Sequence, residues 1–330
     1  MFANLVSYVQ NSGSRFAFFF IVLALYGAVK TAMSLPDVLL ARASPRPLLS
    51  TLGSILFVFS VAFLFFFVVD RALERINIAG IDALVARNND ALLRLDRLLF
   101  RVYVPFWFEN ENNPLNQVFR SLAGILVTTY ASLPFVLAVS LVAALMKDGE
   151  IFSRAVAMYF GIIIVSMLGW YFLPATSPFD AYLDGVPPPV PREEVTRYLA
   201  SYRASEAVVT FTNRLRQIRS QLGPRLWVTT IPSMHIAWAV VVTYTAMTLS
   251  RWLLLVALPY FLLNLISTMS GLQHYAVDVV AGLAVGFAAI LVINRLPPFR
   301  ITLVNRLGES MRRDTLDFLR LMKPPIPKRS

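Results

Sequence analysis

The segment that decides the fold reads QHYAVDVVAGLAVGFAAILVIN and covers residues 273–294. It is long enough and apolar enough to cross a hydrocarbon core of about 30 Å as one helix. Its first turn nevertheless carries His274, Tyr275 and Asp278. Ionisable side chains are costly at membrane depth and usually mark a functional site. The segment therefore predicts both a membrane-spanning helix and a site at its start.

The remainder of the chain has the composition of a polytopic membrane protein. Of its 330 residues, 57% are hydrophobic and 15% are charged, and the mean hydropathy is +0.63, whereas soluble domains are closer to half apolar. The absence of cysteine excludes a thiolate nucleophile and a cysteine-ligated metal site. In a membrane protein a net charge of +11 indicates cytoplasmic anchoring, so we expect no nucleic-acid partner.

Seven apolar stretches approach the roughly 20 residues that a membrane-spanning helix needs. They cover residues 16–35, 48–69, 119–145, 152–173, 231–249, 252–270 and 273–294. The sequence therefore predicts an all-α polytopic membrane protein with about seven transmembrane helices. The predicted parts are N-terminal transmembrane helices with an interfacial amphipathic segment (1–150), a catalytic bundle (151–295) with a long outer loop (174–230), and a basic tail (296–330).

Charge in the short connections predicts how the helices cross the membrane. From residue 295 onward the chain carries nine Lys or Arg against three acidic residues, and the positive-inside rule places such a tail in the cytoplasm. Counting back through the spans puts the segments 70–118 and 174–230 on the extracytoplasmic face. The spans that start at 231 and 273 then both begin there. We therefore expect a multi-pass integral membrane protein whose active site lies on the extracytoplasmic face.

Both long outer segments contain patterns typical of amphipathic helices. Between residues 80 and 102, apolar residues recur at three- and four-residue steps with arginines between them. This predicts a helix in the membrane interface, which either shields a site or only rests there. A second helix is predicted to begin at Glu193 and to end near Arg219, before Gly223. Its basic end is either solvated or a guide for anionic head groups.

The two histidines are predicted to meet, because their helices begin on the same face. Asp278 follows His274 by four residues, so both side chains lie on one side of a helix. Ser233 precedes the helix of His235, whose free N–H groups suit an anion. This matches phosphoryl transfer in which His274 attacks phosphorus, Asp278 supports it and His235 protonates the leaving oxygen. The candidate phosphate-binding residues are Ser233, Tyr275, Arg225 and Ser177.

The same residues also suit two roles that involve no phosphoryl transfer. The histidines could simply hydrogen-bond between helices, as polar residues in membrane bundles do. His235, His274 and Asp278 could also hold zinc or iron, because two imidazoles and a carboxylate are suitable ligands. The convergence of both histidines with a carboxylate favours a catalytic site over either alternative. We expect neither a metal nor another cofactor.

Two motifs carry a resemblance to a known family: Pro232-Ser233-Met234-His235 and His274-Tyr275-Ala276-Val277-Asp278. They resemble the second and third motifs of the type 2 phosphatidic acid phosphatase (PAP2) superfamily, P-S-G-H and S-R-x5-H-x3-D. They are most similar to its inositol phosphorylceramide synthase (Aur1-like) branch, where the last motif reads H-Y-x-x-D. The resemblance covers about 165–295 and leaves the first 150 residues outside it. It implies a six-helix core and a metal-independent phosphohistidine mechanism with His274 as the nucleophile.

Departures from the phosphatase pattern favour head-group transfer. Met234 stands where the phosphatase motif has glycine, and Thr268 stands where it has arginine, which makes the phosphate pocket less cationic. The first phosphatase motif, K-x6-R-P, is absent, and segment 173–178 resembles its replacement in the synthase branch.

We therefore predict a membrane-embedded phosphotransferase that moves a phosphorylated head group from a lipid donor to a lipid or polyol acceptor. The expected partners are membrane lipids: a phospholipid, a sphingolipid or a prenyl phosphate. Hydrolysis of a lipid phosphate or a prenyl pyrophosphate is the alternative. A transporter or a lipid-binding scaffold is less favoured.

Overall fold

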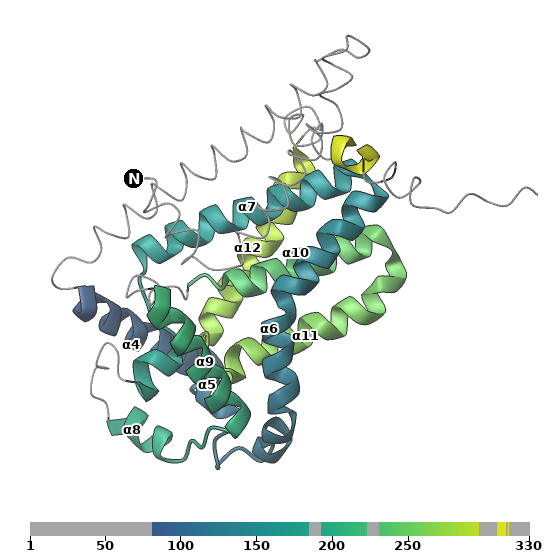
Figure 1. Ribbon diagram of the computed structural model, residues 1–330. Coiled ribbons are helices and arrows are strands. Elements are labelled where there is room, and N and C mark those ends of the chain that lie inside the picture. The colour runs from purple at the N-terminus through teal and green to yellow at the C-terminus, as the bar shows by residue number, and fades with distance from the viewer. Residues whose placement is uncertain (1–80, 185–192, 223–230, 297–308, 315, 317–330) are drawn as a thin grey trace, which may run out of the picture. The chain divides into compact units, whose positions relative to one another are not determined.

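The computed structural model describes residues 81–184, 193–222, 231–296, 309–314 and 316 (Figure 1). Its elements are α4 (Ile81–Phe100), α5 (Val104–Trp107), α6 (Asn116–Lys147), α7 (Gly149–Phe172), the π-helix η1 (Phe179–Leu183), α8 (Glu193–Ala200), α9 (Glu206–Leu222), α10 (Met234–Leu249), the 3-10 helix η3 (Arg251–Leu253), α11 (Leu254–Ser270) and α12 (Ala276–Arg295). No β-strand occurs among the described residues. The prediction of an all-α fold is confirmed for this part of the chain.

Four helices in the described residues are long and apolar enough to cross a membrane. They are Asn116–Lys147, Gly149–Phe172, Arg251–Ser270 and Ala276–Arg295. These match four of the predicted spans, and the span predicted at 231–249 forms the shorter apolar helix α10. The spans predicted at 16–35 and 48–69 lie outside the described residues. The count of seven is therefore not confirmed.

The chain divides into two compact units. The first comprises residues 1–66, 138–157 and 293–330, and the second comprises residues 67–137 and 158–292. Within the first unit, Arg154 pairs with Glu150 (2.7 Å) and donates to the carbonyl oxygen of Ile293 (3.0 Å). Every predicted site residue that the structure describes belongs to the second unit.

Helix α4 forms where the amphipathic pattern predicts it, and its inner face binds the segment that follows α7. Asn88 donates to the carbonyl oxygen of Pro174 (2.8 Å). The side chain of Asn89 makes two hydrogen bonds with Thr176, at 2.8 and 2.9 Å. Both Asn89 and Thr176 are buried. These polar contacts fix the orientation of α4 around its own axis.

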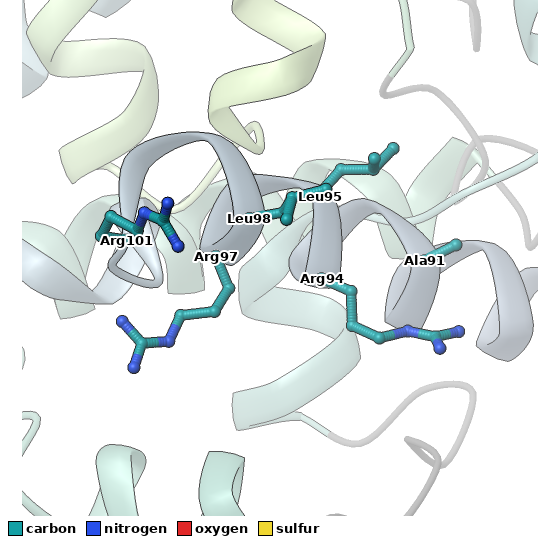
Figure 2. Close-up of a pocket in the computed structure, with 6 residues that line it drawn as sticks. All are labelled: Ala91, Arg94, Leu95, Arg97, Leu98 and Arg101. Carbon is teal, nitrogen blue, oxygen red and sulfur yellow. The ribbon is translucent and has the colours of Figure 1, made fainter.

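The outer face of α4 has a different character. It lines an open groove of about 730 Å³, and the lining side chains are Ala91, Arg94, Leu95, Arg97, Leu98 and Arg101 (Figure 2). Leu98 is 64% exposed, and Leu95 and Leu99 are also exposed. Exposed leucines alternating with arginines are typical of a helix that lies in a membrane interface.

Two glycines let α12 approach α10 closely. A Cβ atom at Gly282 would collide with the carbonyl oxygen of Ser233. A Cβ atom at Gly286 would lie 2.9 Å from Cβ of Val240 and 3.0 Å from the carbonyl oxygen of Ala237. Small residues four positions apart are typical of closely packed membrane helices. The start of α10 therefore lies directly against α12.

The outer segment after residue 193 differs from its prediction. The sequence predicts one helix from Glu193 to near Arg219, but the chain forms two helices, α8 and α9. Ser205 explains the break, because its N–H and its hydroxyl both donate to the buried carboxylate of Glu109. Tyr202, in the same break, forms an isolated bridge with Asn110. These tertiary contacts override the continuous helical pattern.

A buried aromatic cluster joins the outer segments to the start of α12. The ring of Phe106 meets those of Tyr182 and Tyr202 edge-on, with centroids 5.8 and 5.6 Å apart. Leu272 and Tyr275 belong to the same cluster and are fully buried. Edge-to-face aromatic pairs add about 0.5–1.5 kcal/mol each beyond the burial of their area. The segments that carry Phe106, Tyr182 and Tyr202 are therefore packed against the helix that follows His274.

Candidate active site

The pair of His274 and Asp278 forms at the start of α12. Nδ1 of His274 lies 3.4 Å from Oδ2 of Asp278, and the two side chains are 8% and 0% exposed. Oδ2 of Asp278 also accepts the backbone N–H of Tyr275 (3.1 Å), which holds the carboxylate in place. Because the carboxylate faces Nδ1, the opposite ring nitrogen, Nε2, is left for chemistry.

The start of α10 is held against this pair. Ser233 is the N-cap of α10, and its side chain accepts the N–H of Ile236 (3.4 Å). The N–H of Ser233 donates to the carbonyl oxygen of Asp278 (3.0 Å). This hydrogen bond joins the two motifs directly, so the two predicted helix starts are adjacent.

His235 lies in the first turn of α10 and has two clear contacts. Its Nε2 lies 3.0 Å from Oδ1 of Asn264, and its ring stacks on Tyr130 with centroids 4.0 Å apart and planes 7° apart. Asn264 is fully buried on α11, and its Nδ2 donates to the carbonyl oxygen of Tyr260 (3.0 Å). Because the amide nitrogen of Asn264 is engaged there, its oxygen is the atom that faces Nε2 of His235.

Asp96 on α4 is a site residue that neither motif indicates. Its Oδ2 accepts the N–H of Ala276 and its Oδ1 accepts the N–H of Val277, both at 2.9 Å. The residue has no exposed surface. Burial raises the pKa of Asp96 to about 7, the two backbone hydrogen bonds oppose that rise, and the charge of Asp278 adds to it. A carboxylate of α4 thus caps the helix that follows His274.

Ser177 lies in the segment between α7 and η1, beside the same helix start. The N–H of Phe179 donates to the carbonyl oxygen of Leu272 (3.2 Å), which joins this segment to the residues before His274. The hydroxyl of Ser177 donates to Oδ2 of Asp180 (2.6 Å) and accepts its N–H (3.1 Å). Ser177 is therefore near the site, with its hydroxyl directed toward its own turn.

The other predicted phosphate ligands differ in position. Tyr275 is fully buried, and its hydroxyl has no hydrogen-bond partner among the described residues. Arg225 lies outside the described residues. Thr268, which stands where the phosphatase motif has arginine and was not a predicted ligand, is fully buried, and its carbonyl oxygen accepts the N–H of His274 (3.2 Å). Among the predicted phosphate ligands, Ser233 is therefore the one whose contacts tie it most closely to Asp278 and the start of α12.

A metal site is not formed by these side chains. Among the residues that the structure describes, no group of three or more His, Asp or Glu side chains is placed to hold a metal ion. His235 contacts Asn264 and Tyr130, whereas His274 contacts Asp278. The alternative of a zinc or iron site is therefore not supported by their positions.

Three site residues were not predicted: Asp96, Asn264 and Tyr130. Asp96 looks like one acid among several in a charged amphipathic helix. Asn264 gives a clearer signal, because a buried amide in an apolar membrane helix usually has a polar partner. Tyr130 has no signal in the sequence, since its role depends on the packing of α6 beside α10.

Comparison with known proteins identifies the family. The chain matches the family model described as PAP2 superfamily over residues 91–292. The protein therefore belongs to the PAP2 superfamily, whose members are phosphatases and phosphotransferases that act on lipid phosphates. No curated protein and no solved structure matches the chain. The match begins within α4, so the expectation that the first 150 residues lie outside the resemblance is wrong for residues 91–150.

Proposed function

We propose that the protein is a membrane-embedded phosphotransferase that moves a phosphorylated head group from a lipid donor to a lipid or polyol acceptor. The observation that carries this proposal is the distance of 3.4 Å between Nδ1 of His274 and Oδ2 of Asp278, in surroundings almost closed to solvent. A carboxylate in this position stabilises the positive charge that the imidazole acquires when it attacks. Membership of the superfamily supports phosphoryl chemistry at this pair.

The proposed reaction has two steps. In the first, Nε2 of His274 attacks phosphorus, the bond from phosphorus to the donor lipid oxygen breaks, and His235 gives that oxygen a proton. In the second, the acceptor hydroxyl gives its proton to His235, its oxygen attacks phosphorus, and the phosphorus–nitrogen bond breaks. Asp278 balances the charge of the phosphohistidine between the two steps.

Transfer rather than hydrolysis is favoured by the residues around the pair. Thr268 stands where the phosphatase motif has arginine, and the motif K-x6-R-P is absent. Both features match the inositol phosphorylceramide synthase branch, which we propose as the related group. The alternative is a lipid phosphatase of the same superfamily. It differs only in that water, rather than an alcohol, takes the phosphoryl group from His274.

We place the active site on the extracytoplasmic face, the tail in the cytoplasm and α4 in the membrane interface. The exposed leucines of α4 and the basic tail support this placement. Because the chain has no cysteine, single cysteines at Glu193 and Ser330 report the topology. They should label from opposite sides of sealed vesicles, and labelling from one side would contradict the placement.

The function is tested by incubating purified protein with a pool of phospholipids, prenyl pyrophosphates and candidate acceptors, beside His274→Ala. Mass spectrometry should find a new phosphodiester lipid that the variant forms at least about 10⁴-fold more slowly. Dephosphorylated lipid without a new diester would establish the phosphatase alternative. Equal activity of the variant would overturn the phosphohistidine mechanism. EDTA should leave the activity unchanged, and loss on chelation with recovery on zinc addition would contradict this.

A further inference from the structure

Three successive N–H groups at the start of α12, those of residues 275–277, donate to carboxylates. The N–H of Tyr275 donates to Asp278, and those of Ala276 and Val277 donate to Asp96. Asp96 comes from α4, 180 residues earlier in the chain. A helix start with free N–H groups attracts anions. At α12 the place of such an anion is taken by the carboxylates of Asp96 and Asp278.

We propose that Asp96 is a positioning residue that holds the first turn of α12, and with it Asp278, in the orientation that presents His274 for attack. This rests on the proposed function. Asp96 fixes the backbone at Ala276 and Val277, directly between His274 and Asp278. The distance of 3.4 Å between the imidazole and the Asp278 carboxylate depends on that turn remaining helical.

The anchoring of α4 does not by itself require a carboxylate here. Leu92 and Leu93 already bury α4 in the aromatic cluster, and Asn89 binds Thr176. Burying a carboxylate costs free energy unless hydrogen bonds compensate. The two N–H groups of α12 provide that compensation, and the positive end of the helix dipole adds to it. The hydrogen bonds of Asp96 therefore stabilise the start of α12, which follows His274, rather than the position of α4.

The chain offers a matched control on the same helix. Asp90 is also a buried carboxylate of α4, and it pairs with Arg94 of the same helix (2.9 Å). We would compare Asp96→Asn with Asp90→Asn. Asp96→Ser, which keeps one short acceptor, serves as the second variant if Asp96→Asn does not fold.

The first measurement needs no substrate. The chain has two histidines, so labelling with ¹⁵N-histidine in phosphatidylcholine nanodiscs gives two imidazoles whose ¹⁵N shifts report the tautomer. In the wild type, His274 should show one tautomer, protonated at Nδ1. Asp96→Asn should convert the His274 signals to exchange between tautomers and leave those of His235 unchanged. Unchanged His274 signals, or the same change in Asp90→Asn, would overturn the proposal.

The second measurement is the consumption of dioctanoyl phosphatidylinositol, a donor that carries a phosphorylated head group, in the presence of a short-chain ceramide as acceptor. Asp96→Asn should lower kcat roughly 10- to 100-fold, as a displacement of about 1 Å does, with KM changed less than about threefold. Asp90→Asn should keep at least about half of the activity. A fall confined to KM would overturn the positioning role. If His274→Ala stayed active, the proposed function would fail, and the histidine signals alone would decide the role of Asp96.

Discussion

Helices α10 and α12 both begin beside the candidate active site, but their first turns are satisfied in different ways. At α12 the N–H groups of residues 275–277 donate to the carboxylates of Asp278 and Asp96. At α10 the cap is the neutral side chain of Ser233, and the N–H of Met234 has no acceptor among the described residues. We therefore call the start of α12 closed, because its first N–H groups are paired with carboxylates. We call the start of α10 open, because the N–H of Met234 is left for an anion.

The difference assigns separate tasks to the two helices in the proposed reaction. The closed start of α12 presents His274 as the nucleophile without attracting phosphate to its own backbone. The open start of α10 is where the phosphate oxygens would bind, beside Ser233. Because the N–H of Ser233 donates to the carbonyl oxygen of Asp278 (3.0 Å), the two tasks are performed side by side.

The largest expected effect comes from removing the charge that supports His274. Asp278→Asn should lower kcat about 10³- to 10⁴-fold, because a neutral amide cannot stabilise the imidazolium or select its tautomer. Lipid turnover by purified protein measures this. Asp148→Asn is the matched control, since Asp148 accepts the N–H of Glu150 (2.6 Å) at the start of α7 and asparagine caps equally well. Wild-type turnover in Asp278→Asn would show that the negative charge of Asp278 does not support His274.

The next effect comes from separating the two helix starts. Gly282→Ala should force α12 away from Ser233, because the new Cβ meets a backbone carbonyl oxygen that cannot move alone. We expect a loss of about 1–3 kcal/mol in the free energy of unfolding and about a 100-fold loss of turnover.

Gly124→Ala is the control for this substitution. No atom lies within 4 Å of the new Cβ at Gly124 in helix α6, so alanine should stabilise that helix by about 0.5–1 kcal/mol. Denaturation in detergent micelles compares the two variants. Equal stability of both would show that α10 and α12 are not in close contact.

A smaller effect is expected at the open helix start. Ser233→Ala should weaken the binding of orthovanadate, a phosphate analogue, about tenfold, because one hydroxyl donor is lost. Loss of the cap should cost about 1 kcal/mol of stability. Ser250→Ala removes a similar cap, whose side chain accepts the N–H of Trp252 (3.4 Å) away from the site. If both variants bound vanadate like the wild type, the assignment of phosphate to α10 would be wrong.

The last effect is on stability alone and concerns its dependence on pH. Because the pKa of Asp96 rises from 3.8 to about 7 on folding, the folded protein keeps a proton there that the unfolded chain releases. The stabilisation that this proton provides is complete below about pH 4 and is lost as the pH rises to about 7. Between pH 5 and 7 the free energy of unfolding should fall by about 2 kcal/mol at most. Over that range the wild type should lose stability relative to Asp96→Asn in thermal denaturation. Parallel curves would contradict the raised pKa.

The sequence predicted those parts of the site that depend on local spacing. His274 and Asp278 share one turn of a helix, so a four-residue interval was enough to pair them. The predicted helix at 193–219 failed for the opposite reason. Its break depends on Glu109, which binds Ser205 from another part of the chain. No local pattern contains that contact.

By itself the sequence determined the apolar, membrane-spanning character of the chain, the positions of most described helices and the pairing of His274 with Asp278. All three follow from apolar length and helical period, which are properties of consecutive residues. Only the tertiary structure decided that Asp96 closes the start of α12, that Asn264 and Tyr130 hold His235, and that Gly282 lets two helix starts touch. These contacts join segments far apart in the chain, and their geometry follows from packing, which the residues of one segment do not specify.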